Sequence, residues 1–147
     1  MTKFTFFRLW LFVVSIGIAV FGLVLALFPQ SWLMDFLLNS SIDPVFWGDG
    51  IAPQASVTFQ AWAYGVLGAT ISGWGVLMAF VIHMPFKARR RWAWTALAVS
   101  SALWYIVDTS LSAFYGVNYN VWFNTALLIL VAVPLAFTYN NFSSQAD

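Results

Sequence analysis

Asp108 is the side chain whose type and position in the sequence most favour chemistry. It is the only carboxylate inside a long apolar run, and residues 104–110 around it are Trp, Tyr, Ile, Val, Asp, Thr and Ser. A carboxylate within a membrane-spanning segment is costly and marks a functional site by default. It can attract a cation, exchange a proton, or stay protonated and join helices by hydrogen bonds. The sequence leaves these three roles open.

Polar side chains from three segments are expected at the same depth as Asp108. Tyr105 and Ser112 recur at helical spacing on its own segment. Two further segments, at residues 58–64 and 120–124, also bring polar groups to that depth. We therefore predict an outward-facing ligand pocket lined by Asp108, Tyr105, Trp104, Ser112, Gln60, Tyr64, Asn120 and Asn124.

The predicted pocket suits a small amphipathic or cationic ligand, because a carboxylate and aromatic faces both attract cations. Trp62, Trp104 and Trp122 are expected to form its aromatic walls. The alternative is structural, with a protonated Asp108 donating a hydrogen bond to an asparagine carbonyl. Interhelical polar contacts of this kind contribute about 0.6 kcal/mol on average in membranes.

Catalysis has little support in the sequence. General acid–base chemistry usually needs two titratable groups with separated pKa values, and the sole histidine, His83, is expected at the opposite membrane face. The chain has no cysteine, which excludes thiolate metal sites and thiol catalysis. Asp43 and Asp49 are interpreted as turn formers rather than as cation ligands. We predict no catalytic residue, no metal site and no cofactor.

Membrane-spanning helices are the elements that must position these side chains. The 147 residues are 62% hydrophobic and 7% charged, whereas a soluble domain carries about 25% charged residues. We expect one all-α domain, a four-transmembrane-helix bundle with spans at residues 6–28, 57–82, 92–113 and 120–137. An outer loop at residues 29–56 and a basic cytoplasmic loop at residues 83–91 are expected to join the first three spans.

The outer loop is expected to hold a short interfacial helix followed by turns. Ser31 can cap a helix that lies in the membrane interface. Its apolar face is expected to consist of Trp32, Leu33, Phe36 and Leu37, with Asp35 opposite. Residues 39–56 are polar and contain turn-forming pairs such as Asp43-Pro44. Pro85 is expected to end the second span, and the tail beyond residue 140 is expected to fray.

Lysine and arginine counts predict the orientation. The N-terminal segment has two bases and the loop at residues 83–91 has four, whereas the loop at residues 29–56 has none. The positive-inside rule therefore puts both termini and the basic loop in the cytoplasm.

Small residues recur along one face of the second span. They are Ala61, Gly65, Gly68, Ser72, Gly75 and Ala79. Spacings of four and three residues are typical of left-handed helix packing, and small residues let two backbones approach closely in lipid. The pattern favours packing against another helix of the same chain, and a homodimer interface is the alternative.

Residues 57–138 carry short motifs that resemble a known family. These motifs include Tyr64-Gly65-Val66-Leu67-Gly68-Ala69-Thr70, Gly73-Trp74-Gly75-Val76, Arg91-Trp92-Ala93-Trp94, Asp108-Thr109 and Pro134-Leu135. They resemble a family of small bacterial four-helix integral membrane proteins with no established activity, and the layout resembles the wider group of DoxX-type proteins. The resemblance implies four spans in a bacterial cytoplasmic (inner) membrane and implies no catalytic residue.

Three functions are compatible with the sequence. The first is a non-enzymatic integral membrane protein that binds a small or lipidic ligand in the pocket around Asp108. The second is an accessory subunit of a larger membrane complex, and the third is a small oligomeric transporter or a proton-linked membrane enzyme. The expected partners are the lipid bilayer, a small-molecule or lipid ligand, and either a homo-oligomer or a larger membrane complex. A net charge of +1 gives no support for a nucleic-acid partner.

Overall fold

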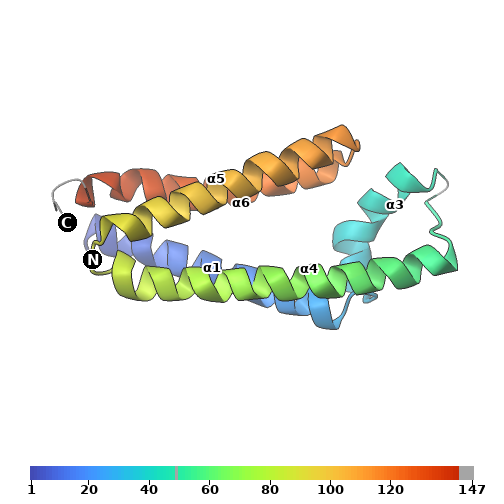
Figure 1. The fold of residues 1–147 in the computed structure, drawn as a ribbon, viewed down its shortest axis with the longest axis horizontal. Coiled ribbons are helices and arrows are strands. Elements are labelled where there is room, and N and C mark those ends of the chain that lie inside the picture. The colour runs from blue at the N-terminus through green and yellow to red at the C-terminus, as the bar shows by residue number, and fades with distance from the viewer. Residues whose placement is uncertain (49, 143–147) are drawn as a thin grey trace.

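The computed structural model describes residues 1–48 and 50–142, and all regular structure in these residues is helical (Figure 1). Four of the helices are long: α1 (Lys3–Leu27), α4 (Gln54–Val81), α5 (Arg91–Phe114) and α6 (Asn118–Thr138). In the described residues these four are long and apolar enough to cross a membrane by length and composition. The predicted all-α architecture with four long apolar helices is confirmed. The predicted fraying is wrong for residues 140–142, because a 3₁₀ turn, η3 (Tyr139–Asn141), continues from α6 and Phe142 is buried. Asp49, for which a turn was expected, and residues 143–147 lie outside the described residues.

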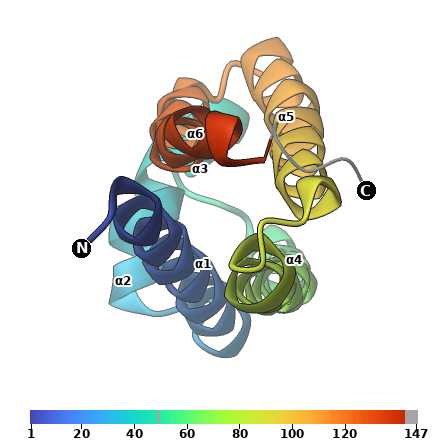
Figure 2. The ribbon, with the colours of Figure 1, turned by 90° about the vertical axis from the view of Figure 1, so that its left-hand side faces the viewer.

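The two ends of the bundle differ in character. The N-terminus, the end of α6 and the connection between α4 and α5 lie at one end, which we call the basic end because all six lysines and arginines belong to segments that meet there (Figure 1). The helix α3 (Ser40–Phe46) and the turn between α5 and α6 lie at the other end, which we call the loop end. Viewed along the bundle, the long helices follow the order α1, α4, α5, α6 (Figure 2).

The predicted small-residue face of α4 packs against α1. Gly68, Ser72, Gly75 and Ala79 are buried, and Ala61 and Gly65 are partly buried nearer the loop end. A Cβ atom on Gly68 would lie 2.5 Å from the backbone N of Ala26 and 2.5 Å from the backbone O of Gly22. Only glycine fits such a contact, so the two backbones touch directly.

The matching face of α1 also consists of small residues. Ser15, Ala19, Gly22 and Ala26 follow one another at spacings of four, three and four, and their backbone atoms are the ones that approach Gly68, Ser72 and Gly75. This second half of the interface was not predicted from the sequence, although the same spacing rule identifies it.

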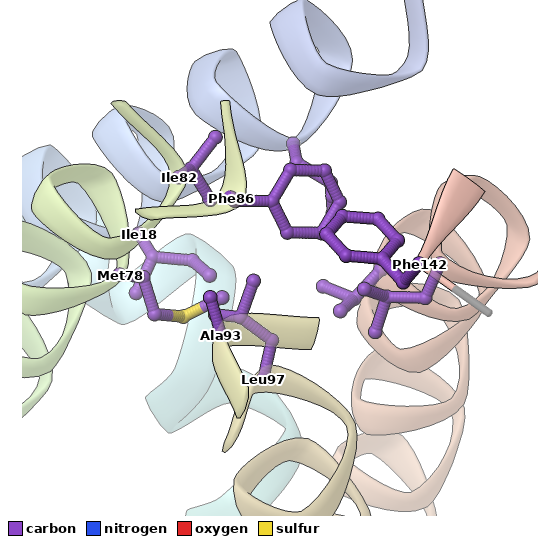
Figure 3. Close-up of a cluster of buried hydrophobic side chains, with 10 residues drawn as sticks. Ile18, Met78, Ile82, Phe86, Ala93, Leu97 and Phe142 are labelled. Atoms are coloured by element: carbon purple, nitrogen blue, oxygen red, sulfur yellow. The ribbon is translucent and has the colours of Figure 1, made fainter. Parts of the chain in front are cut away.

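The main apolar core lies toward the basic end (Figure 3). All four long helices contribute to it, and its buried members are Leu11, Ile18, Met78, Ile82, Phe86, Ala93, Leu97, Val131, Leu135 and Phe142. Phe86 lies between Phe4 and Phe142, with ring centroids 5.9 Å and 4.7 Å away. These rings close the basic end of the bundle.

The prediction that Pro85 ends the second span is wrong. The helix continues from α4 into a π-helical turn, η2 (Ile82–Phe86), and Arg90 N donates to Pro85 O at 2.9 Å. Proline removes one backbone donor, but the extra turn places Phe86 in the core with no exposed surface. Core packing therefore prevails over the local signal, and the predicted loop at residues 83–91 is shorter than expected.

A helix does begin after Ser31, but it extends further than predicted. The segments α2 (Trp32–Met34), η1 (Asp35–Asn39) and α3 follow one another without a break. The predicted turn at Asp43-Pro44 is wrong, because both residues lie within α3. A hydrogen bond of 3.0 Å from Gln60 Nε2 to Asp43 Oδ1 joins this helix to α4.

The segment also has a buried face that the sequence analysis did not predict. Met34 and Leu38 are buried with Leu25 of α1, whereas Trp32 and Phe36 are 79% and 72% exposed. Both faces of the segment are therefore apolar, one toward the bundle and one away from it.

The glycine contact between α1 and α4 predicts a position-specific effect on stability. In Gly75→Ala the new Cβ atom would meet Ala19 N at 2.5 Å and Ser15 O at 2.8 Å. Overpacking of this kind costs about 1–3 kcal/mol. We expect a lower thermal unfolding midpoint for the detergent-solubilised variant.

The matched control is Gly73→Ala on the same helix, where a Cβ atom would meet nothing within 4 Å. Replacing glycine by alanine in an open helical position gains up to about 1 kcal/mol, so we expect this variant to be as stable as the parent or more so. Equal loss of stability in both variants would contradict the close contact.

Candidate functional site

Asp108 lies at the interface of α5 and α6, near the loop end. Its Oδ1 atom accepts from Asn120 Nδ2 at 2.7 Å and from Asn124 Nδ2 at 3.0 Å. Ser112 Oγ lies 2.7 Å from the backbone O of Asp108 and 3.2 Å from Oδ1, so its single hydrogen is shared between the two. Asn124 is only 1% exposed and also donates to Thr109 Oγ1 at 3.4 Å. We call these five residues the Asp108 cluster.

The helices bring this cluster together for local reasons. Asp108 and Ser112 are one turn apart on α5, and Asn120 and Asn124 are one turn apart on α6, so each pair shares a helix face. A tight turn joins the helices, with Gly116 at φ +77°, where glycine is unstrained. The turn makes α5 and α6 antiparallel neighbours and sets the two faces against each other.

The two carboxylate oxygens of Asp108 have different surroundings. All three side-chain donors point at Oδ1, and Oδ2 has no hydrogen-bond donor among residues 1–48 and 50–142. In the same residues the only fully buried side-chain oxygen or nitrogen without a partner is Ser101 Oγ. Asp108 is partly exposed, and Oδ2 is therefore not fully buried. One oxygen fixes the carboxylate in place while the other is open.

Positive charge lies far from this carboxylate. Every lysine and arginine is at the basic end, and Arg91, at the start of α5, is 17 residues from Asp108, or about 25 Å along the helix. The donors that surround Asp108 are neutral amides and a hydroxyl. Any cation at Oδ2 must therefore come from outside the chain.

Gln60 and Tyr64 belong to a separate polar cluster. Gln60 Nε2 lies 3.2 Å from Asn39 Oδ1, 3.0 Å from Asp43 Oδ1 and 3.1 Å from Tyr64 Oη. Tyr64 Oη in turn donates to Asn39 Oδ1 at 3.0 Å. These bonds join α4 to the segment at residues 32–46. The structure therefore separates Gln60 and Tyr64 from the four predicted pocket residues that lie in the Asp108 cluster.

The predicted aromatic residues of the pocket are also dispersed. Tyr105 Oη bonds to Thr125 Oγ1 at 3.2 Å, one turn below the Asp108 cluster. The ring of Trp104 lies 5.8 Å from the ring of Trp74 on α4. Trp62 and Trp122 are 64% and 74% exposed and point away from the bundle, so they do not form walls around Asp108.

Four polar partners in these clusters were not predicted from the sequence. Asn39 and Asp43 are four residues apart, a helical spacing that was interpreted as part of a turn region. Thr109 and Thr125 complete the contacts between α5 and α6. Threonines are common inside apolar helices, so neither carries a distinctive signal.

The helix α3 connects the two polar regions at the loop end. Asp43 bonds to α4, and the ring of Phe46 lies 6.4 Å from the ring of Tyr115 in the α5–α6 turn. A Cβ atom on Gly116 would lie 3.9 Å from Val45 Cγ1. This helix therefore extends from α4 to the turn that closes the Asp108 cluster.

In the part of the chain that the structure describes, no three metal-ligating side chains come together. His83 is exposed at the basic end, where its ring lies 5.9 Å from the ring of Phe12.

Comparison of the chain with protein-family models, with curated proteins and with solved structures finds no match.

The separation of the two polar clusters predicts a pattern of energetic coupling. Asn124 and Asp108 are in contact, and interhelical hydrogen bonds in membrane proteins couple by about 0.6 kcal/mol on average and by up to about 1.7 kcal/mol. In a double-mutant cycle, Asn124→Ala and Asp108→Ala should therefore be non-additive in the free energy of unfolding.

The control cycle pairs Asp108→Ala with Gln60→Ala. These residues share no partner, so their effects should add to within about 0.5 kcal/mol. Strong coupling between Gln60 and Asp108 would mean that the two clusters form one network.

Proposed function

We propose that the four long helices span a bacterial cytoplasmic membrane with the basic end in the cytoplasm. The concentration of lysine and arginine at one end supports this orientation. Apolar side chains on the outer faces of the helices support insertion; Val13, Val20 and Leu27 of α1, for example, are 62%, 52% and 67% exposed. On this proposal the segment at residues 32–46 lies at the outer interface, with Trp32 and Phe36 directed toward lipid.

The orientation is testable because the chain has no cysteine. Gln54→Cys at the loop end and Ala88→Cys at the basic end each introduce one exposed thiol. In intact cells a membrane-impermeant maleimide should label Gln54→Cys alone, and after permeabilisation it should label both. Labelling of Ala88→Cys alone in intact cells would reverse the proposed topology.

The function proposed for this protein is non-enzymatic binding of a small amphipathic or cationic ligand at Asp108. The observation that carries this proposal is the open Oδ2 atom of a carboxylate whose other oxygen is held by Asn120, Asn124 and Ser112. Asp108 lies six residues before the end of α5, about 9 Å from the loop end. At that depth an amine headgroup can reach the carboxylate while its apolar part stays in the membrane.

A purely structural role, in which Asp108 only holds α5 and α6 together, explains the same residues less well. Asn124 and Asn120 would join α5 to α6 equally well through a neutral acceptor, such as an asparagine at position 108. A carboxylate adds charge at a costly depth, and its open oxygen contributes nothing to the joint. The charge therefore favours a role toward a molecule outside the chain.

Native mass spectrometry of the protein extracted gently from its own membranes tests this function. Asp108→Asn keeps a side-chain carbonyl that accepts from Asn120 and Asn124, so the fold should persist. Hydrogen bonds to charged groups contribute about 1.5–3 kcal/mol, so we expect a bound molecule in the parent and at least a roughly tenfold loss in the variant.

Asp43→Asn is the matched control, because Asp43 is also hydrogen-bonded but belongs to the other cluster. It should retain the ligand. A parent protein that carries no small molecule and is held by a larger protein would instead favour an accessory subunit. A pH-dependent flux across the membrane of liposomes that contain the protein, lost in Asp108→Asn, would favour a transporter.

A further inference from the structure

A hollow of about 510 Å³ lies between α5 and α6, in the half of the bundle toward the basic end. Small side chains from both helices create it: Ala98, Ser101 and Ala102 on α5, and Ala132 and Ala136 on α6. Large apolar side chains form the rest of its lining. The hollow does not reach the Asp108 cluster.

A second hollow, of about 180 Å³, continues the first toward the basic end. Trp94 and Tyr139 line both, and Arg91 and Thr95 line the second. The rings of Trp94 and Tyr139 meet edge to face with centroids 5.1 Å apart, and Trp94 Nε1 donates to Leu135 O at 2.9 Å. The shared wall is therefore held in place by protein contacts. Together the two form a groove that is apolar along its length and cationic at one end.

The groove has the length of one membrane leaflet. From Trp94 to Ala102 it follows α5 for eight residues, or about 12 Å. Half of a hydrocarbon core of roughly 30 Å is about 15 Å. In the proposed orientation Arg91 lies at headgroup depth on the cytoplasmic side, and Ser101 lies near the midplane.

The width of the groove decides which kind of molecule it can enclose, a lipid chain or a helix of a partner protein. A volume of about 510 Å³ over a length of about 12 Å gives a cross-section of roughly 40 Å². A helix with its side chains is about 10–12 Å wide, which corresponds to roughly 80 Å² or more. The groove is too narrow to enclose a helix and wide enough for an extended hydrocarbon chain.

We propose that this groove binds an anionic phospholipid of the cytoplasmic leaflet, with the phosphate at Arg91 and one acyl chain between α5 and α6. Phosphate is the group that an arginine guanidinium binds best in a membrane headgroup. Lys87, Arg89 and Arg90 line neither hollow, so Arg91 is the base placed to meet the phosphate. The site requires the proposed membrane orientation but is independent of any ligand at Asp108.

Replacement of Ser101 tests whether the molecule bound in the groove is an acyl chain. Its Oγ atom is buried and has no hydrogen-bond partner in the described residues, and it lies at the end of the groove away from Arg91. An acyl chain offers no polar atom there, so Ser101→Ala should not change lipid affinity. A large loss of binding in Ser101→Ala would mean that the occupant carries a polar group at the midplane, and would overturn the proposal.

The experiment measures binding of added phosphatidylglycerol and of phosphatidylcholine with the same chains, by native mass spectrometry in detergent. One basic residue near the surface corresponds to about a fivefold change in affinity. We expect phosphatidylglycerol to bind about fivefold more tightly than phosphatidylcholine, and Arg91→Gln to remove that difference. Arg90→Gln is the matched control, since Arg90 lines neither hollow.

Blocking the groove is the second arm. Ala132→Phe places a ring in the hollow and should abolish binding of both lipids, whereas Ala96→Phe, on an exposed face of α5 outside the hollow, should not. If Ala132→Phe does not fold, Ala136→Phe serves the same purpose. Undiminished lipid binding in a folded, blocked variant would overturn the proposal, as would equal affinity for the two lipids in the parent.

Discussion

The direct backbone contact between α1 and α4 is the constraint on which the rest of the structure depends. Gly22, Gly68 and Gly75 leave no space for a side chain at this interface. In a lipid environment the hydrophobic effect does not drive helices together, so close van der Waals contact must do so. Because the two backbones are in direct contact, the interface between α1 and α4 has no room for a ligand or water.

The hairpin of α5 and α6 is built on different contacts. It meets the α1–α4 pair through aliphatic side chains of the main core and through ring pairs. The ring pairs are Phe21 with Phe123 and Trp74 with Trp104, whose centroids are 5.8 Å apart in each case. Within the hairpin, polar bonds join the two helices at three levels. They run from Trp94 to Leu135, from Tyr105 to Thr125 and from Asp108 to Asn124.

This division explains where the candidate sites occur. The bonds at Trp94 and Tyr105 hold α5 and α6 together without close packing between them, and the hollow lies in that interval. The third level leaves Asp108 Oδ2 open. A tightly packed pair thus supports a looser hairpin, and both proposed binding sites belong to the hairpin.

Much of the architecture followed from local patterns in the sequence. Four long apolar runs predicted the four helices, and the small residues of α4 marked a close packing face. The meeting of Asp108 with Asn120 and Asn124 was also predictable, because a short turn forces neighbouring helices to be antiparallel and helical spacing puts both asparagines on one face.

The remaining features depend on contacts between distant segments. Equal depth does not make two residues neighbours, and Gln60 and Tyr64 are bonded instead to the segment at residues 32–46. Pro44 and Pro85 were expected to interrupt helices, yet bonds and packing from other segments keep both within helical turns. The open Oδ2 atom and the unpartnered Ser101 Oγ are properties of three-dimensional packing that no spacing rule reveals.

The most direct test of the account is an experimental structure of the protein, crystallised after gentle extraction from its own membranes. We expect non-protein density within hydrogen-bonding distance of Asp108 Oδ2, while Asn120 and Asn124 still donate to Oδ1. A structure in which a protein donor bonds to Oδ2, with the carboxylate enclosed between α5 and α6, would contradict the proposed ligand site. Asp108 would then serve only to hold α5 and α6 together.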